Sequence, residues 1–330
     1  MEITLPKYID KLIFEKLGGI YSPGEDVDVN LNNDEIKTKK YLGTYFPRSF
    51  AESYSLFNFL FDKKKYKDIL SSKHEIKILD IGAGTGGNLT GLLYAFLDNL
   101  PDINNFKIIA MDGNEFSFKY QDVFISNVKN YYGKKIEFLS LHGSVDSEKG
   151  LKEAFSRAEK KFITQDFDFI ISSKFLAELY SQNPEGENNH YFELLNIAGK
   201  YLSETGIISL IDITPPDKKG SRGFMPYIIN EEVSDYLRFS SDLAILVPRI
   251  CKEYMPCINP KKCFRQRVMF VNHSKKRKDV SKHYYIVLGK SQFVDNISSE
   301  LSILKDVSFK NYYGDEICIG ICDKGKFKWL

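Results

Sequence analysis

The sequence predicts an α/β fold in which a parallel sheet is covered on both faces by helices. From Glu75 onward, apolar β-branched runs alternate with stretches of helical periodicity. Strands buried on both faces read as continuous apolar runs, and crossover helices join them, so this alternation is typical of a parallel sheet. The composition of the 330 residues, 43% hydrophobic and 27% charged, is that of a soluble globular protein. The expected strands are "IKILDIG", "FKIIAMD", "KIEFLSL", "FDFIISS" and "GIISLIDI".

Three parts are expected along the chain. Residues 1–73 form a helical segment, with a helix in "PRSFAESYSLFNFLFDKKKY" that starts at Pro47. Residues 74–214 form the alternating core, and residues 215–330 begin with a Pro/Gly-rich loop. In this last part "HYYIVLGK" and "EICIGIC" are expected to close the sheet as antiparallel edge strands.

The chain has no run of about 18 apolar residues, so no membrane-spanning helix and no membrane partner are expected. Its first residues, "MEITLPKYIDKLIFEKLGG", predict an amphipathic helix of the folded protein and neither a secretory signal nor a transit peptide. A cytoplasmic location, where thiols stay reduced, is the resulting expectation.

Positive charge is concentrated in one stretch, although the net charge is only +2. Between Val247 and Lys282 there are eleven Lys or Arg residues, opposed only by Glu253 and Asp279. A local excess of positive charge attracts anions and suits phosphate backbones. The alternative is a solvated lysine-rich loop.

A glycine-rich turn follows the first core strand in "ILDIGAGTGGN", residues 78–88. Gly82, Gly84 and Gly86 permit tight turning and close approach of the backbone to a ligand. Asp80 precedes the turn, where a carboxylate can fix the loop or receive an ammonium group. Asp112 ends the second strand, where an acid can bind both hydroxyls of a ribose. A dinucleotide-binding loop prefers G-x-G-x-x-G, so NAD(P) is the less favoured ligand.

The stretch "LDIGAGTG" resembles motif I of class I S-adenosylmethionine (SAM) methyltransferases, whose fold is a Rossmann-like seven-stranded sheet. The resemblance implies that Gly82 and Gly84 line the methionine end of SAM and that Asp112 holds the ribose. It places adenine beside the residues that follow the third strand, and the sulfonium beside those that follow the fourth. The expected cofactor-binding residues are Asp80, Gly82, Gly84, Thr85, Asp112, Gly143, Ser144, Val145, Ser172 and Ser173.

Further segments resemble the mitochondrial small-ribosomal-subunit methyltransferase-like family and its bacterial relatives, from about Tyr41 to the C-terminus. These segments are "YLGTYFPRSFAESYSLF", "FDFIISSKFLAEL", "LIDITPPDKKGSRGF", "LVPRICKEYMPCINPKKCFRQR" and "YYIVLGK". That family carries cysteines for an iron–sulfur cluster, and the matching positions imply Cys251, Cys257, Cys263 and, in "GICDKG", Cys322. Cys318 is then spare. The resemblance also implies ribosomal RNA or the small ribosomal subunit as partner.

Four thiolates can hold either a [4Fe–4S] cluster or a tetrahedral zinc ion. The cluster is favoured, because a Cys₄ zinc site commonly uses closer C-x₂-C pairs. The alternative is five separately buried cysteines, which the polar segment "KEYMPCINPKK" disfavours.

Methyl transfer needs a nucleophile in line with the sulfonium and sometimes a base. No [D/N]-P-P-[Y/F] motif follows the fourth strand, where "SSKFLAELY" stands instead. Glu178 is the candidate base there, with capping or orienting a neighbouring helix as the alternative. Tyr45 and Arg48 are candidates to close over SAM or bind substrate, and a structural ion pair is the alternative for Arg48. His190 is expected at the surface at the start of a helix, and Arg222 is expected to contact an anionic substrate.

Three functions therefore stay open. The first is an RNA-linked methyltransferase or small-subunit assembly factor with a structural or substrate-docking [4Fe–4S] cluster. The second is a methyltransferase acting on a peptide or a small metabolite. The third is a non-catalytic SAM-binding protein, because no base is evident.

Overall fold

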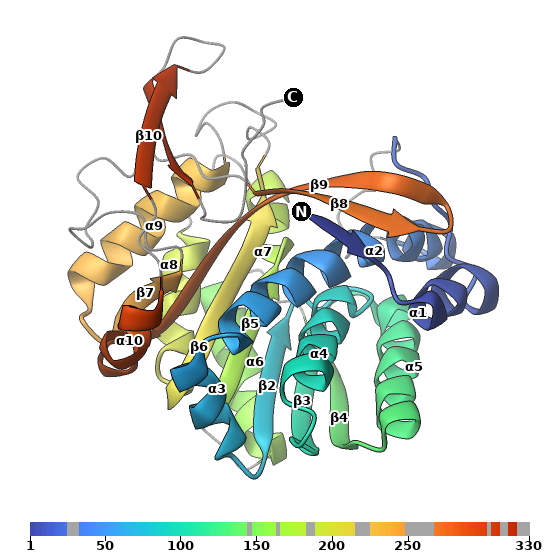
Figure 1. The fold of residues 1–330 in the computed structure, drawn as a ribbon, viewed down its shortest axis with the longest axis horizontal. Helices are drawn as coiled ribbons and strands as arrows, with labels where there is room; N and C mark the ends of the chain where they lie inside the picture. The colour runs from blue at the N-terminus through green and yellow to red at the C-terminus, as the bar shows by residue number, and fades with distance from the viewer. Residues whose placement is uncertain are drawn as a thin grey trace. The chain divides into compact units, whose positions relative to one another are not determined.

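The computed structural model describes residues 1–24, 33–143, 147–162, 166–182, 189–214, 225–247, 267–301, 305–310 and 316–321. Figure 1 shows the labelled helices and strands of the chain, which its contacts divide into two compact units. The first unit is Met1–Val145 with Met269–Ser281, and the second is Asp146–Val268 with Lys282–Leu330. Strands and helices alternate in both units, and the core strands of each unit include parallel pairs, which confirms the predicted α/β class.

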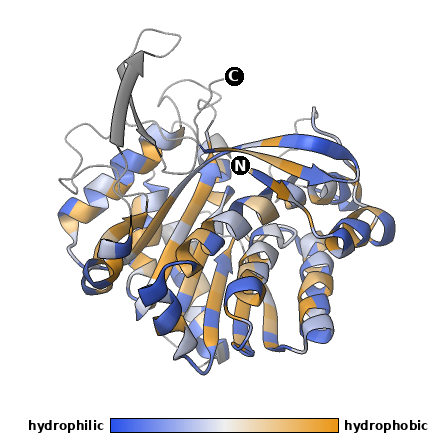
Figure 2. Ribbon diagram, in the orientation of Figure 1, coloured by the Kyte–Doolittle hydropathy of each residue, from blue (hydrophilic) through white to orange (hydrophobic). Residues whose placement is uncertain are grey.

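The first unit contains three parallel strands, β2 (Ile76–Ile81), β3 (Asn105–Asp112) and β4 (Lys135–His142), in the order β2-β3-β4. Figure 2 shows apolar residues along these strands, as expected of a sheet covered on both faces. Helix α4 (Gly87–Asn99) joins β2 to β3, and α5 (Glu115–Tyr132) joins β3 to β4. The carboxyl ends of β2 and β3 therefore meet at one edge, with the glycine turn between them.

Helix α2 (Glu35–Phe61) begins well before the predicted start, and Pro47 lies inside it, so that prediction was wrong. Asp34 caps its N-terminus by accepting a hydrogen bond from the Lys37 N–H at 2.7 Å. An internal proline costs about 3 kcal/mol or more. Burial of a long apolar face, including Phe46, Phe50 and Phe57, offsets that cost.

Helices α2 and α4 pack closely because α4 presents glycine at the contact. A Cβ atom on Gly91 would lie 2.4 Å from the Phe50 carbonyl oxygen, and one on Gly87 would lie 3.0 Å from the Phe46 carbonyl oxygen. Ser53 Oγ donates a hydrogen bond of 2.7 Å to the Asn88 carbonyl across the same interface. The packing holds the start of α4, and with it the glycine turn, against α2.

The N-terminal segment contains β1 (Glu2–Thr4), α1 (Lys7–Lys11) and the π-helix η1 (Leu12–Lys16). Strand β1 pairs in parallel with β8 (Arg267–His273), which turns directly into β9 (Lys276–Lys290). Helix α3 (Lys64–Ser71) follows α2. The sequence pattern predicted neither strand, and β1 has only three residues and pairs with a segment distant in sequence.

In the second unit β5 (Phe167–Ser173) pairs in parallel with β6 (Leu202–Ile213), and β6 pairs antiparallel with β9. The prediction that "HYYIVLGK" forms an antiparallel neighbour of the parallel strands is therefore confirmed. Strand β7 (Leu243–Val247) pairs antiparallel with β9. The helices of this unit are α6 (Glu148–Phe162), α7 (Phe175–Gln182), α8 (His190–Ala198), α9 (Met225–Phe239), α10 (Ser291–Ile297) and the 3₁₀ turn η4 (Ser298–Glu300).

The expectation that "EICIGIC" closes the main sheet was wrong. Strand β11 (Glu316–Ile321) instead pairs antiparallel with β10 (Lys305–Lys310) in a separate two-stranded sheet. The place beside β9 is taken by β7. Pairing between neighbouring segments closes a short loop, which costs less conformational entropy than a distant pairing.

Among the residues that the structure describes, no helix combines the length and the apolar character that a membrane crossing requires.

Candidate cofactor site

The glycine turn between β2 and α4 adopts a backbone that other residues rarely tolerate. Gly82, Gly84 and Gly86 have φ angles of 70°, 52° and 88°, all in the left-handed region. The N–H groups of Gly82 and Ala83 both donate to the Met111 carbonyl, at 2.9 and 3.0 Å. The turn is therefore tied to the end of β3 and needs glycine at three alternate positions.

Asp112 holds this turn with its side chain. Its Oδ2 accepts a hydrogen bond from the Gly84 N–H at 2.7 Å, and its Oδ1 accepts one from the Asn114 N–H at 2.8 Å. Burial raises the pKa of the Asp112 carboxyl to about 6, although these N–H donors act in the opposite direction. A carboxylate has about four lone-pair positions, so accepting bonds from its own loop is compatible with accepting bonds from the hydroxyls of a ribose.

Gln121 on α5 supports the turn from a second side, and the sequence analysis missed it. Its Nε2 donates to the Gly84 carbonyl at 2.6 Å, and Ser140 Oγ donates to its Oε1 at 3.1 Å. The available signal was an amide among apolar positions on the helix, between Tyr120 and Phe124. Because Gln121 is only 1% exposed, its amide orientation is fixed by these two partners.

Aromatic side chains of α2 lie over the turn. A Cβ atom on Gly84 would lie 3.3 Å from the ring of Tyr41. The ring of Tyr41 contacts that of Tyr45, with centroids 5.0 Å apart. Tyr45, a candidate substrate-closing residue, thus lies one ring away from the glycine turn.

Asp80 is the most unusual residue of the site. Its side chain is fully buried, and neither carboxylate oxygen has a hydrogen-bond partner in the part of the chain that the structure describes. Burial raises its pKa well above the ordinary value, and the nearby Asp112 charge raises it further. A buried acid in this condition is costly in the free protein and is suited to receive a cation.

The other expected cofactor residues are distributed over both units. Thr85 is buried in the turn, and the Gly143 N–H donates to the Asp112 carbonyl at 3.1 Å. Ser144 and Val145 lie outside the described residues. Ser172 and Ser173 are buried at the end of β5 in the second unit, and their role toward the sulfonium stays a prediction.

The second unit contains Glu178, the candidate base, and His190, which was expected at the surface. Glu178 lies in the first turn of α7, where its N–H bonds the carbonyl of Lys174 at 3.3 Å. Lys174 has a φ of 61°, a conformation that costs energy in a residue with a side chain. His190 does begin α8, but it is only 3% exposed, so its predicted surface location was wrong. Its ring packs against that of Tyr180, with centroids 4.9 Å apart, and its backbone N–H donates a hydrogen bond to the Tyr180 hydroxyl.

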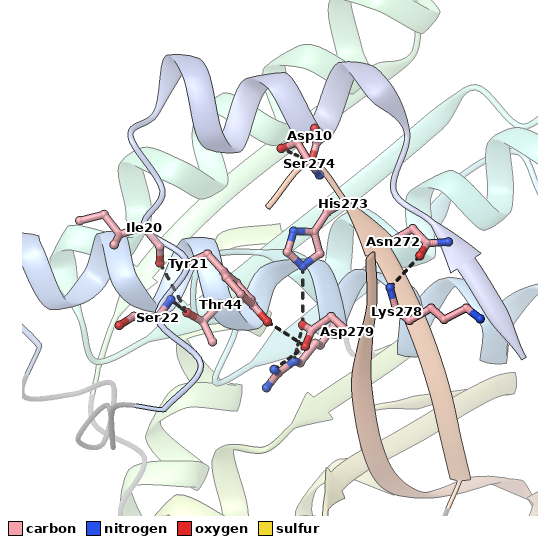
Figure 3. A network of polar contacts seen from close by, with 11 residues as sticks. Asp10, Ile20, Tyr21, Ser22, Thr44, Asn272, His273, Ser274, Lys278 and Asp279 are labelled. Carbon is pink, nitrogen blue, oxygen red and sulfur yellow. Dashed lines mark hydrogen bonds and ion pairs between the residues drawn. The ribbon is translucent and has the colours of Figure 1, made fainter. Parts of the chain in front are cut away.

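Arg48, the remaining candidate, lies in a network with the β8–β9 hairpin (Figure 3). Its Nε and Nη2 each donate to the Asp279 carboxylate at 2.8 Å. Tyr21 donates to the same carboxylate at 3.1 Å, and His273 Nε2 lies 3.6 Å from it. Burial alone would raise the pKa of Asp279, but the hydrogen bonds from these donors hold it below its ordinary value. A substrate role of Arg48 stays a prediction.

The four predicted metal ligands lie outside the described residues, and so does Arg222. Within the described ranges, no group of three or more His, Cys, Asp or Glu side chains is placed to hold a metal ion.

No protein-family model matches the sequence, and no curated protein matches it significantly. Solved structures with a similar arrangement include MNMC2 from Aquifex aeolicus, at 15% identity and a TM-score of 0.36 over 60% of this chain and 56% of that one. A putative class I SAM-dependent methyltransferase from Listeria monocytogenes matches at 12% identity and a TM-score of 0.41, over 80% and 70% of the two chains. A SAM-dependent methyltransferase from Methanosarcina mazei matches at 13% identity and a TM-score of 0.36, over 68% of this chain and 96% of that one. The chain thus spans little more than half of the Aquifex protein, and values this low carry no functional argument.

Proposed function

We propose that this protein is a SAM-dependent methyltransferase whose cofactor lies on the glycine turn of the first unit. The observation that carries the proposal is the buried, unpartnered carboxylate of Asp80 beneath that turn. Loss of hydration without a compensating partner is unfavourable for a charge. The methionine end of SAM brings an ammonium group, which would supply that partner.

The same carboxylate argues against a dinucleotide. A pyrophosphate would bring two further negative charges to the turn, close to Asp80 and Asp112. Negative charges near a buried carboxyl oppose its ionisation, so a pyrophosphate would leave Asp80 without the cation that stabilises its charged form. Asp112 suits a ribose in either ligand, so Asp80 is the residue that discriminates between them.

Each residue of the turn has a task in this proposal. Asp112 accepts the ribose hydroxyls while its bonds from the Gly84 and Asn114 N–H groups hold it in place. The three left-handed glycines let the backbone approach the ligand, and Tyr41 covers Gly84. When bound, SAM supplies an electrophilic methyl group on a sulfonium. Correct placement of that group is the principal contribution expected from these residues.

Calorimetric titration with SAM tests the proposal directly. The wild-type protein should bind SAM, and Asp80→Asn should weaken binding by about 10- to 100-fold, since a charged hydrogen bond contributes about 1.5–3 kcal/mol. Asp102→Asn is the matched control, because Asp102 is exposed beyond α4. A wild-type protein that does not bind SAM would refute the proposal, and equal affinities of wild type and Asp80→Asn would remove its main support.

RNA is the methyl acceptor that we favour. The support is the excess of positive charge between residues 247 and 282, of which Lys275, Lys276, Arg277 and Lys278 are exposed. Methyl transfer from labelled SAM to ribosomal RNA would support this acceptor. Transfer to a peptide or metabolite pool, with none to RNA, would support the second candidate. Tight SAM binding without turnover on any pool would identify a non-catalytic binding protein.

The cysteines carry a separate proposal, a [4Fe–4S] cluster held by Cys251, Cys257, Cys263 and Cys322, with zinc as the alternative. Anaerobic purification followed by iron and sulfide analysis and a visible spectrum tests it. Colourless protein with stoichiometric zinc would eliminate the cluster. Unchanged metal content in Cys257→Ser would contradict the ligand assignment.

A further inference from the structure

Three exposed tyrosines contact one another on the first unit, where apolar rings would ordinarily be buried. Tyr131 is 70% exposed, Tyr132 39% and Tyr8 38%. The rings of Tyr8 and Tyr131 are stacked, with centroids 5.6 Å apart and an interplanar angle of 18°. Tyr132 meets Tyr131 edge to face at 4.9 Å. The cluster joins α1 to the C-terminal end of α5, two elements that are distant in sequence.

The rings are held in position from behind. The Tyr8 hydroxyl donates to Asn127 Oδ1, while Asn127 Nδ2 donates to the Val123 carbonyl within α5 at 2.6 Å. Tyr132 also packs edge to face on Tyr94, which is 7% exposed, at 5.7 Å. Rings fixed in this way lose little further entropy when a flat ligand stacks on them.

Lysines surround the cluster. Lys16 Nζ lies 5.9 Å from the centre of the Tyr8 ring. Lys129 lies one helical turn before Tyr132 and, together with Lys135, lines a pocket of about 380 Å³. Glu137 is an acid of the same pocket.

The other two lysines of this pocket are already bonded. Lys107 forms an ion pair with Glu75 at 3.4 Å. Lys134 Nζ donates to the carbonyls of Pro101 and Ile103. Lys129 and Lys135 form no ion pair within the described ranges, so they are the ones available to an anion.

The turn of the β8–β9 hairpin extends this surface. Asp10 of α1 accepts hydrogen bonds from the N–H and Oγ of Ser274, at 2.9 and 3.1 Å (Figure 3), which fixes the turn beside the helix that carries Tyr8. The four basic residues that follow, 275–278, are all exposed. Asp279 is the next acid in the chain, but its carboxylate is bound by Arg48. The positive charge of the turn is therefore not neutralised by Asp279.

We propose that this tyrosine–lysine surface, comprising Tyr8, Tyr131, Tyr132, Lys16, Lys129, Lys135 and residues 275–278, binds single-stranded nucleic acid. Exposed rings stack on the faces of bases, and neighbouring cations pair with the phosphates between them. Only unpaired strands offer free base faces, so a duplex fits less well. An acidic peptide would use the lysines but would leave the exposed rings without a role.

The tyrosines at the end of α5 are separate from the cofactor turn. Helix α5 runs from the carboxyl end of β3, where Asp112 lies, to the amino end of β4, where Lys135 lies. Tyr131 and Tyr132 are therefore at the strand edge opposite the glycine turn. The tyrosines therefore belong to a docking site rather than a methylation site, and a base stacked on Tyr131 leaves the SAM position open. Only the choice of RNA as the polymer rests on the proposed function.

Fluorescence anisotropy with a labelled single-stranded RNA oligonucleotide of mixed sequence tests the surface. Tyr131→Ala should weaken binding about tenfold, as expected for loss of one stacked base, whereas Tyr131→Phe should retain it because the ring remains. The double variant Lys129→Glu and Lys135→Glu should weaken binding and flatten the dependence of log affinity on log salt by about one. Lys64→Glu with Lys67→Glu, the same charge change on exposed α3 positions, should have little effect.

Further arms identify the ligand. Heparin, a polyanion without bases, should bind wild type and Tyr131→Ala equally. The matching single-stranded DNA should bind as the RNA does if stacking and phosphate contacts suffice, and more weakly if the 2′-hydroxyl is read. SAM titrations should give the same affinity for Tyr131→Ala and wild type. This separates failure of the surface from failure of the cofactor proposal.

Other outcomes would overturn the proposal. These are a wild-type protein that does not bind the oligonucleotide and an affinity unchanged by Tyr131→Ala. Loss of binding to anionic vesicles in Tyr131→Ala, with RNA binding intact, would show a membrane surface. Loss of a dimer in sedimentation, again with RNA binding intact, would show a contact between copies of the chain.

Discussion

Two buried aspartates of the first unit, Asp80 and Asp279, are in opposite electrostatic situations. Asp279 receives two hydrogen bonds from Arg48 and one from Tyr21, and its pKa is lowered. Asp80 has no partner among the residues that the structure describes, and its pKa is raised. Both carboxylates are nearly inaccessible, at 4% and 0% exposure, so burial alone does not explain the difference.

The comparison separates a structural acid from one that is available to a ligand. A buried charge that is fully hydrogen-bonded ties distant segments together, and its loss leaves the partner unpaired. A buried charge without a partner destabilises the free protein and persists where function requires it. Asp279 thus fastens the β8–β9 hairpin to α2, whereas Asp80 is the acid that the proposed cofactor would engage.

The largest expected effect is on the structural side of the comparison. Asp279→Asn should lower the free energy of unfolding by about 3 kcal/mol, because the partly buried guanidinium of Arg48 loses its counter-charge. Urea unfolding monitored by circular dichroism measures it. The control is Asp235→Asn, which removes an exposed pair with Arg238 and should cost about 0.5 kcal/mol. Similar losses in both variants would show that Asp279 is no more than a surface pair.

Asp80→Asn should change the free energy of unfolding of the SAM-free protein in the opposite direction. It should raise the free energy of unfolding at pH 7 by about 1 kcal/mol, a typical gain when a functional site loses a destabilising group. Unfolding of the SAM-free protein in urea measures it. A destabilisation as large as that of Asp279→Asn would contradict the assignment of Asp80 as unpartnered.

The pH dependence sharpens the same contrast. Asp279, with a lowered pKa, contributes stability above its ordinary pKa near 4, and this contribution is lost as the pH falls through the lowered value. Asp80 and Asp112, with raised pKa values, act in the other direction. Their contribution is complete below about pH 4 and declines as the pH rises, for Asp112 up to about pH 6. Unfolding curves between pH 4 and pH 7 should therefore be flatter for Asp112→Asn than for wild type. Equal slopes would refute the raised pKa of Asp112.

The smallest expected effect is the difference between two glycine substitutions, one of them in the turn beside Asp112. Gly84→Ala should cost about 1–2 kcal/mol, because its φ of 52° disfavours a side chain and the new Cβ would meet Tyr41. Gly133→Ala has the same backbone penalty at a φ of 66° but nothing within 4 Å. The difference between the two, measured by thermal unfolding, isolates the contact with Tyr41. Only Gly84→Ala should also weaken SAM binding, and equal SAM affinities would show that the turn does not touch the cofactor.

The parts of the fold that sequence predicted correctly depend on local chemistry. Strands such as β2 and β3 follow from continuous apolar runs. The turn at residues 82–86 follows from its glycines, because glycine is the residue that readily adopts the left-handed backbone. The parts that it missed depend on remote partners. Pro47 inside α2 is tolerated because of the helix's buried apolar face, and β1 pairs with β8 from the other end of the chain.

By itself the sequence determined the alternation of strands and helices, the glycine turn and the two acids, Asp80 and Asp112, that flank it. Only the tertiary structure decided which acid is paired. Arg48 and Asp279 are 231 positions apart, and Tyr8 and Asn127 are 119 apart. No local pattern encodes such contacts, because they depend on how separate elements pack once the chain has folded. The same packing leaves one carboxylate without a partner and one group of tyrosines exposed.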